Sequence, residues 1–171
     1  MIEIRDYIRE IADFPKPGIR FKDISPLLRD SAAFAHCVDL LVAQARVVRF
    51  DLILAPESRG FIFGAALAAR LGCGFVPVRK PGKLPYQTLQ VEYALEYGTD
   101  VLQMHVDAVY PGQRVLLVDD VLATGGTMSA CAELVEQSDG VVAACQFLIE
   151  LKFLEGRRRL KDYQVAALID A

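Results

Sequence analysis

Short apolar runs alternate with amphipathic segments over most of the chain. Runs of strand length, in which apolar residues dominate, lie at residues 51–55, 74–78, 115–118, 141–150 and 163–169. Apolar side chains recur three or four residues apart, as on one face of a helix, at residues 31–48, 61–72 and 128–137. Because strands that alternate with helices form mainly parallel sheets, the pattern predicts an α/β fold with a twisted, mainly parallel sheet flanked by helices.

The first thirty residues differ from the rest of the chain. Residues 2–12 place Ile4, Ile8 and Ile11 on one helical face, which predicts a short docking helix. Residues 14–28 contain three prolines and a glycine, which forbid a regular helix, yet they retain several large apolar side chains. We interpret this stretch as an ordered flap, in which the Phe21 ring either stacks on a flat heterocycle or anchors the loop in the core.

The carboxyl end carries a run of basic residues. Residues 152–161 predict a charged helix, and its sequence GRRR looks like a nucleic-acid tract. Glu155 and Asp162 flank the run, and a single short charge run is weak evidence of binding. We therefore interpret it as a solvated face.

Length and composition limit the domain organisation. The 171 residues correspond to one domain, and a hydrophobic content of 53% argues against disorder. We expect a single domain over residues 1–171, with a small amino-terminal hood at residues 1–30 and an α/β core at residues 31–171.

Charge and cysteine content exclude several classes of function. A net charge of −3 provides no global basic field for nucleic acid or an anionic membrane. No apolar run approaches the roughly 20 residues of a membrane span, and the charged amino terminus differs from a signal peptide, so we expect a cytoplasmic protein. The four cysteines include no CxxC pair, which favours buried free thiols over a zinc site, and two histidines leave little for a His-based triad.

The most specific chemistry lies in residues 115–127, which read VLLVDDVLATGGT. Residues 115–118 predict a strand buried on both faces, and Asp119 and Asp120 follow where we expect the strand to end. Open α/β sheets bind ligands at this end of their strands. Two adjacent carboxylates there are costly unless they are hydrogen-bonded, and the 2′ and 3′ hydroxyls of a ribose are a suitable pair of donors.

A glycine turn follows the acid pair and opens the next predicted helix. It consists of Ala123, Thr124, Gly125, Gly126 and Thr127. Glycines allow backbone N–H groups to approach a ligand, a helix start leaves its first N–H groups unpaired, and threonine hydroxyls add donors. The turn is therefore predicted to bind a phosphate, and the diol site and the turn together predict binding of a ribose 5-phosphate.

Other nucleotide-binding motifs do not fit this stretch. A Walker loop needs a lysine after its last glycine, whereas Thr127 follows Gly126, and the dinucleotide pattern GxGxxG is absent. The remaining alternative is an ordinary strand-to-helix turn with solvated carboxylates.

Two basic turns follow other predicted strands. Ser58, Arg59 and Gly60 lie between a strand and a helix, where the Arg59 guanidinium could hold phosphate oxygens in a bidentate manner. The alternative for Arg59 is a plain surface ion pair.

The second basic turn follows residues 74–78 and reads RKPGKLP. Its cations are Arg79, Lys80 and Lys83, which form a local anion site within an acidic protein. A solvated charge run is the alternative. Because the turn follows a strand and shares the chain with two other phosphate turns, we assign it to a pyrophosphate group.

Residues 88–105 alternate and break at the segment Leu95-Glu96-Tyr97-Gly98, which predicts a hairpin within a mobile loop at about residues 84–105. Such loops can close over a site and exclude water, which protects a reactive sugar donor from hydrolysis. By composition alone, Glu96 is an exposed glutamate of that hairpin.

These segments together resemble the type I phosphoribosyltransferases. Residues 115–127 are similar to the family's phosphoribosyl pyrophosphate (PRPP) signature, and the SRG, RKPGKLP and LEYG segments follow the family's order. The hood sequence FPKPGIRFKDISPLL is similar to that of members that use adenine. The resemblance covers nearly the whole chain and implies the fold of that family with a transferase that converts adenine and PRPP into AMP and diphosphate in purine salvage.

The resemblance also implies roles for individual residues. Glu96 would be the catalytic general acid and base, with Tyr97 as a neighbouring contact in the loop. The resemblance places the adenine contacts at Arg20 and Lys22 by main chain and at Phe21 by its ring. The ribose and 5′-phosphate contacts would be Asp119, Asp120, Ala123, Thr124, Gly125, Gly126 and Thr127, and the pyrophosphate contacts Ser58, Arg59, Gly60, Arg79, Lys80 and Lys83.

Further implications concern the cofactor, the assembly and one peptide bond. Mg²⁺ is expected to be held mainly by the oxygens of PRPP, with no direct protein ligand. The resemblance implies a homodimer, in which Arg79 could serve the neighbouring subunit's site, and a cis peptide bond between Glu57 and Ser58. Two alternatives stay open: the same chemistry on another base, such as a 6-oxopurine, and a non-catalytic regulator that senses PRPP or purines.

Overall fold

The computed structural model describes residues 2–94 and 98–171, and its contacts divide the chain into two compact units, Met1–Leu40 and Leu41–Ala171. The elements that begin in the first unit are η1 (Ile4–Tyr7), β1 (Arg9–Ala12), β2 (Arg20–Asp23), α1 (Ser25–Arg29) and α2 (Ser31–Ala45). The second unit contains β3 (Leu52–Pro56), α3 (Arg59–Leu71), β4 (Gly74–Val78), β5 (Thr88–Ala94), β6 (Thr99–His105), β7 (Arg114–Leu122), α4 (Gly126–Gln137), β8 (Val141–Glu150), η2 (Lys152–Leu154), η3 (Gly156–Leu160) and β9 (Val165–Asp170).

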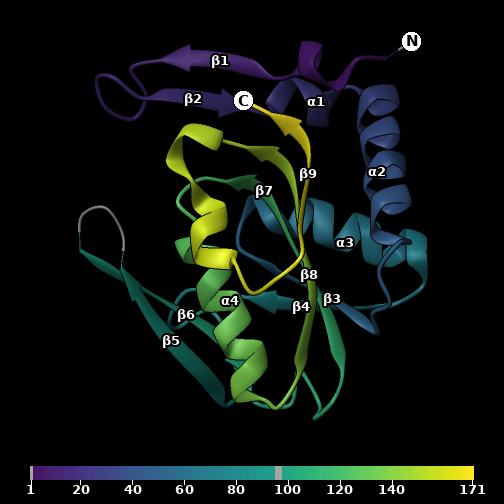
Figure 1. Cartoon of the computed structure of the whole chain (residues 1–171), viewed down its shortest axis with the longest axis vertical. Helices are drawn as coiled ribbons and strands as arrows, with labels where there is room; N and C mark the ends of the chain where they lie inside the picture. Colours follow the sequence, from purple (N-terminus) through teal and green to yellow (C-terminus); the bar gives the residue numbers. More distant parts are fainter. Residues whose placement is uncertain (1, 95–97) are drawn as a thin grey trace. The chain divides into compact units, whose positions relative to one another are not determined.

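A parallel sheet forms the centre of the second unit (Figure 1). Its strand order is β4-β3-β7-β8-β9, and every neighbouring pair is parallel. β5 and β6 form a separate antiparallel hairpin that packs beside α4. The predicted α/β fold is therefore confirmed, with β4 and β8 at the residues that the apolar runs indicated.

Helices α3 and α4 cover opposite faces of this sheet. Leu52 and Leu54 of β3 share a core cluster with Leu134 of α4. Side chains alternate between the faces of a strand, so Ala55 points to the other face, where it lies against Gly64 of α3. All five residues of β3 are buried, as expected for a parallel strand covered on both sides.

β7 is longer than the apolar run predicted. It continues to Leu122, so Asp119 and Asp120 lie within the strand and not after its end. On one side, its pairing with β3 stops at Leu117. On the other side, its pairing with β8 continues to Leu122. The expectation that the strand ends at residue 118 is wrong because β8 supplies backbone partners for the polar positions as well.

The amino-terminal helix predicted at residues 2–12 is wrong. Only Ile4–Tyr7 form a short 3-10 turn, and Arg9–Ala12 form β1, which pairs antiparallel with β2. Three isoleucines at helical spacing are too few to outweigh this pairing, which joins residues about ten positions apart. The stretch expected to be an irregular flap contains β2 and the five-residue helix α1, which has Pro26 in its first turn, where proline is tolerated.

The charged helix predicted at residues 152–161 is also wrong. Two short 3-10 helices take its place, separated by Glu155 in the left-handed region with φ 52°. Arg157, Arg158 and Arg159 are exposed, which confirms the interpretation of the basic run as a solvated face, although the Arg157 guanidinium also donates two hydrogen bonds of 2.7 Å to the buried Glu150.

Three of the four cysteines are buried as expected, namely Cys37, Cys131 and Cys145, whereas Cys73 is half-buried. All four are free thiols. Burial raises the pKa of Cys37 and of Cys145 to about 12, so both thiols are protonated at neutral pH. Among the described helices, none has the length and apolar content needed to cross a membrane.

Replacing Gly64 by alanine should destabilise the contact between α3 and the sheet. A Cβ at this position would lie 2.7 Å from Phe75 Cε2 and 2.9 Å from Ala55 Cβ, too close without movement of the neighbours. Overpacking of this kind costs about 1–3 kcal/mol, against roughly 1 kcal/mol gained in helix propensity. We expect urea denaturation of Gly64→Ala to show a net loss of stability of about 1 kcal/mol. The control is Gly74→Ala, whose Cβ would meet nothing closer than Leu52 Cβ at 3.8 Å; equal stability of the two variants would contradict the prediction.

Candidate functional site

The acid pair of β7 is partly buried and held by neighbouring groups. Asp119 Oδ1 accepts a hydrogen bond of 2.8 Å from the Asp120 N–H. Asp120 is 4% exposed, and its Oδ2 lies 2.8 Å from Arg59 Nε in an ion pair. The two carboxylates therefore differ: one side of Asp120 is engaged by a guanidinium, whereas Asp119 lines an open pocket.

Burial disfavours the charged form of both carboxylates. It raises the pKa of Asp119 well above its ordinary value, and the neighbouring Asp120 charge adds to the rise. Burial also raises the pKa of Asp120, but the Arg59 guanidinium opposes that rise. Asp119 is consequently the costlier of the two charges to maintain in the folded protein.

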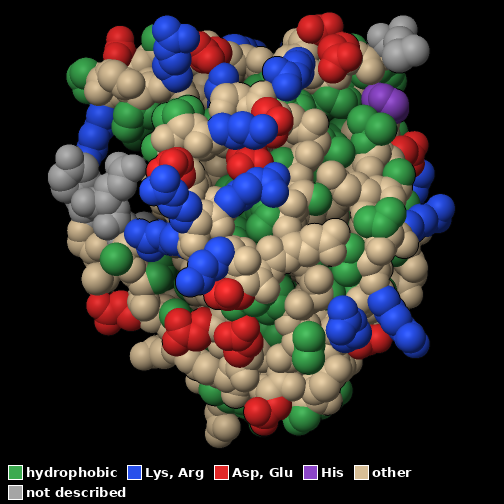
Figure 2. Space-filling model, viewed as in Figure 1, with side chains coloured by type: hydrophobic (Ala, Val, Ile, Leu, Met, Phe, Trp, Pro, Cys, Tyr) green, Lys and Arg blue, Asp and Glu red, His purple; other side chains and the backbone are tan. Residues whose placement is uncertain are grey.

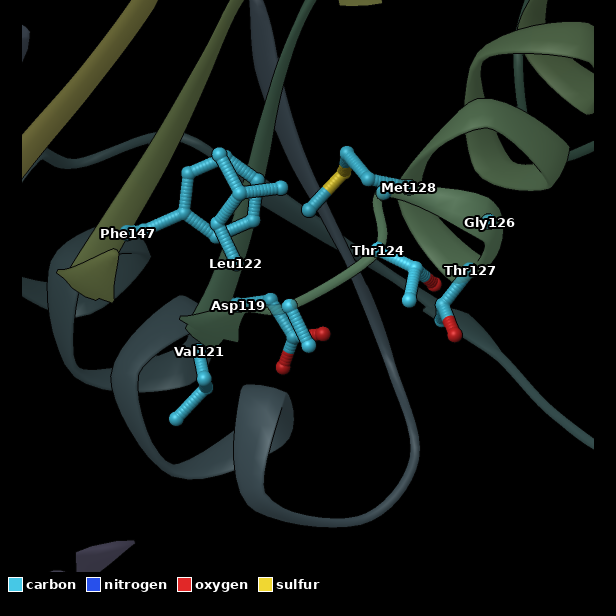
Figure 3. A pocket seen from close by; sticks show the side chains of 10 residues that line it. Asp119, Val121, Leu122, Thr124, Gly126, Thr127, Met128 and Phe147 are labelled. Carbon is cyan, nitrogen blue, oxygen red and sulfur yellow. The ribbon is translucent and has the colours of Figure 1, made fainter. Parts of the chain in front are cut away.

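A pocket lies between the acid pair and the start of α4. It is lined by Asp119, residues 121–128 and Phe147. In Figure 3 the polar ends of Asp119, Thr124 and Thr127 lie below the side chains of Leu122, Met128 and Phe147. The carboxylate and the hydroxyls predicted to hold a ribose and a phosphate thus share one cavity.

The start of α4 leaves its first N–H groups without a capping side chain. Gly125 is the N-cap residue, has no side chain to cap with, and adopts a left-handed φ of 82°, a region that glycine enters at little cost. The N–H groups at such a helix start attract anions. The predicted phosphate turn therefore has the backbone geometry of an anion site.

Gly156 of η3 holds this turn from outside the motif. A Cβ on Gly125 would lie 2.5 Å from the Gly156 carbonyl oxygen, and a Cβ on Gly156 would overlap the Ala123 carbonyl oxygen. Only glycine fits this mutual contact of two backbones. The local signal for this contact in the sequence is the glycine that precedes the three arginines of the basic run.

The second predicted phosphate turn lies directly against the acid pair. Besides the ion pair of Arg59 with Asp120, a Cβ on Gly60 would lie 2.8 Å from Asp119 Oδ1. Ser58 precedes α3 at its exposed start and makes no capping hydrogen bond with its side chain. The peptide bond between Glu57 and Ser58 is cis, as the family resemblance implied.

The RKPGKLP turn is tied to the SRG turn through Glu57. Glu57 accepts a hydrogen bond of 2.7 Å from the Lys80 N–H and lies 3.4 Å from Arg79 Nη2. Burial raises the pKa of Glu57, but these donors outweigh that effect, so the pKa lies below its ordinary value. The Arg79 guanidinium also packs over the Phe61 ring, 6.0 Å from its centroid, and Lys83 is exposed.

A chain of polar side chains links the RKPGKLP turn to the phosphate turn through the β5–β6 hairpin. Lys80 Nζ lies 2.9 Å from Asp100 Oδ2, which raises the pKa of Lys80. Tyr93 interacts with the side chains of Asp100 and Thr127. Sequence analysis missed Glu57, Tyr93 and Asp100, because only the fold brings these residues to the predicted cations and hydroxyls.

The predicted adenine contacts lie on β2 in the first unit. Arg20 and Lys22 point to the side of Glu10 and form ion pairs of 2.8 and 2.7 Å with it. Phe21 is half-buried and packs edge-on against Phe14, with 5.2 Å between the ring centroids. Glu96 and Tyr97 lie outside the described residues, so the roles expected of them stay predictions.

The sheet and the site at its edge are those of a phosphoribosyltransferase. Comparison with known proteins gives the same class. Residues 31–166 match the family model of the phosphoribosyl transferase domain. The chain is 59% identical over 167 residues to the adenine phosphoribosyltransferase of Caldanaerobacter subterraneus subsp. tengcongensis, which covers 98% of this chain and 96% of that relative.

Solved structures give the same result. The crystal structure of adenine phosphoribosyltransferase from Thermoanaerobacter pseudethanolicus matches with a TM-score of 0.97 at 58% identity, over 98% of both chains. The enzyme from Saccharomyces cerevisiae, in complex with adenine and an imino-altritol bisphosphate, matches with a TM-score of 0.90 at 40% identity, over 96% of both chains. The chain belongs to the adenine phosphoribosyltransferase family, which confirms the family resemblance.

Replacing Asp119 by asparagine should raise stability at neutral pH. A carboxyl group whose pKa is raised on folding makes the native state less stable as pH rises from its unfolded pKa, about 3.9, through the folded one. The asparagine keeps an oxygen that can accept the Asp120 N–H and removes the charge. We expect a gain of roughly 1 kcal/mol or more at pH 7, because each pKa unit corresponds to about 1.4 kcal/mol, and little difference from the wild type near pH 3.

Thermal unfolding across that pH range measures the effect. The control is Asp107→Asn, which neutralises an exposed carboxylate. If Asp119→Asn has a lower Tm than the wild type at pH 7, the destabilising effect assigned to this charge is refuted.

Proposed function

We propose that the protein transfers the phosphoribosyl group of PRPP to adenine and forms AMP and diphosphate. One observation carries this most directly: the start of α3 contacts the acid pair of β7, through Arg59 to Asp120 and Gly60 to Asp119. A basic turn suited to diphosphate thus adjoins carboxylates suited to a ribose diol. The anomeric carbon, which bonds to both the ribose ring and the diphosphate, would lie between them.

The first task of the site is to hold the donor. The carboxylates of Asp119 and Asp120 accept hydrogen bonds from the ribose 2′ and 3′ hydroxyls. The backbone N–H groups of residues 123–127 and the hydroxyls of Thr124 and Thr127 hold the 5′-phosphate. Fixing the sugar at both ends orients the anomeric carbon for attack.

The second task is to stabilise the leaving group. As the glycosidic bond breaks, positive charge develops on the ribose and negative charge on diphosphate. Arg59, with Ser58 and Gly60 at the start of α3, and the cations Arg79, Lys80 and Lys83 offset that negative charge. Arg79 and Lys80 are oriented by Glu57 and Asp100, so part of the cost of ordering these side chains is met before the donor binds.

The third task is to receive the base. β2 pairs with one strand, β1, in the described part of the chain. Arg20 and Lys22 would therefore contact adenine through main-chain groups of β2, with the ring of Phe21 against the heterocycle. Adenine loses its N9 proton as it attacks, and a carboxyl group at Glu96 would act as acid and base near the imidazole edge.

Mg²⁺ fits this donor set as an ion carried by the substrate. Among residues 2–94 and 98–171, no three or more His, Cys, Asp or Glu side chains are grouped so that they could hold a metal. Mg²⁺ prefers oxygen ligands and commonly binds through substrate phosphates. Bound to the diphosphate oxygens, it would add positive charge on the side of the leaving group.

We also propose a homodimer and a cytoplasmic location. The homodimer rests on the family resemblance, and the location on the composition. Arg79 forms an ion pair with Glu57 of its own chain.

The proposal is tested by diphosphate release from PRPP and Mg²⁺ with adenine, hypoxanthine, guanine, xanthine and uracil offered separately. We expect release with adenine and at least 100-fold less with each other base, because unpaired polar groups in a base pocket are strongly disfavoured. Release with hypoxanthine instead would retain the phosphate sites and refute the assignment of the hood. Tight PRPP binding without release for any base would favour a regulator.

The variant Glu96→Gln separates the enzyme from the regulator. Loss of a general acid and base costs about 10²–10⁴-fold in rate, so we expect kcat with adenine to fall by that factor while PRPP affinity changes little. Steady-state kinetics and calorimetric titration of PRPP measure the two quantities. The control is Glu92→Gln, which alters an exposed glutamate of β5 in the same hairpin. Wild-type turnover by Glu96→Gln would refute the assigned role.

A further inference from the structure

The phosphate turn carries no cation of its own. Residues 119–128, DDVLATGGTM, contain two aspartates and neither lysine nor arginine. A 5′-phosphate carries nearly two negative charges at neutral pH, and it would lie close to those aspartates. Backbone N–H groups and the α4 dipole favour the anion, but they add no net positive charge to offset the carboxylates.

Arg159 of η3 is the cation that the fold places beside this turn. A Cβ on Gly126 would lie 3.6 Å from Arg159 Nη1, and a Cβ on Gly125 would lie 3.4 Å from Arg159 Cβ. The guanidinium therefore lies over the first residue of α4. The mutual contact of Gly156 with Gly125 and Ala123 keeps η3 against the turn, which fixes the backbone from which Arg159 projects.

The three consecutive arginines of η3 have different surroundings. Arg157 forms two hydrogen bonds with Glu150, and Arg158 pairs with Glu155 at 2.7 Å. Arg159 is exposed and forms no ion pair with any residue in the described ranges. Figure 2 shows basic side chains gathered over the part of the face where Figure 1 draws the carboxyl-terminal 3-10 turns. Of the three, Arg159 is the guanidinium available to an anion at the start of α4.

We propose that Arg159 binds the 5′-phosphate of the donor and of AMP, as an affinity residue contributed from outside the signature turn. The inference rests on the proposed function, since it assigns a further residue to the phosphate end of that site. An arginine suits this position because its planar guanidinium can donate two parallel hydrogen bonds to phosphate oxygens. It would also compensate for the charges of Asp119 and Asp120 at the other end of the sugar.

The test compares AMP with adenosine, which lacks only the phosphate. Calorimetric titration of Arg159→Gln should show AMP binding weakened about tenfold, the effect expected of one lost charge-assisted contact at an exposed site. Adenosine binding should be unchanged, and Arg159→Lys should recover part of the AMP affinity through its charge. In turnover, the KM for PRPP should rise about tenfold with little change in kcat, because the contact exists in both ground and transition states.

The matched control is Arg158→Gln, which removes the neighbouring guanidinium of the same 3-10 helix and should bind AMP as the wild type does. Equal AMP affinity of Arg159→Gln and wild type would overturn the inference. Equal weakening of AMP and adenosine would also overturn it, because it would indicate a structural role. Both results leave the proposed function intact if the wild type releases diphosphate with adenine, whereas a wild type that neither binds AMP nor releases diphosphate refutes both.

Discussion

The site depends on one ion pair, between Arg59 at the start of α3 and the buried Asp120 of β7. A carboxylate taken out of water is costly unless an opposite charge lies beside it, so α3 must start where its guanidinium reaches β7. The sheet allows this because β3 pairs with β7 only as far as Leu117. β3 stays paired with β4 as far as Pro56, and α3 starts at Arg59, whose side chain reaches Asp120 of β7.

The arrangement that makes the site suitable for a ribose also costs stability. Asp119 is buried beside a second carboxylate, and both burial and that charge raise its pKa. A folded protein without a ligand gains nothing from this charge, whereas a bound diol would supply the hydrogen bonds that it lacks. Gly125 and Gly156 add a second constraint, because their backbones touch and neither position has room for a side chain. Cost of this kind, concentrated at one end of one strand, is typical of functional sites.

Sequence patterns predicted the parts of the fold that local sequence determines. β4 and β8 are mainly apolar runs bounded by polar or glycine residues, so the pattern identified them at Gly74–Val78 and Val141–Glu150. β1 was missed because its pairing with β2 determines it, and η3 was missed because Glu155, in the left-handed region, divides residues 152–160 into two 3-10 helices. In β7, the polar positions Asp119 and Asp120 hid the strand's continuation, which pairing with β8 supports.

The same distinction explains which site residues a sequence can reveal. A phosphate turn is recognisable because its donors are consecutive backbone N–H groups, so the acid pair, the glycines and the helix start appear in one short stretch. Its surroundings are not local. Tyr93 reaches Thr127 from a hairpin, Lys80 is held by Asp100, and Gly156 lies about thirty residues beyond the turn that it supports. A motif that consists mainly of backbone can hold an anion but cannot adjust its own net charge, so the balancing cations must come from other elements. In the proposed site, the basic turns after β3 and β4 would balance the diphosphate, and at the phosphate end the element within reach is η3.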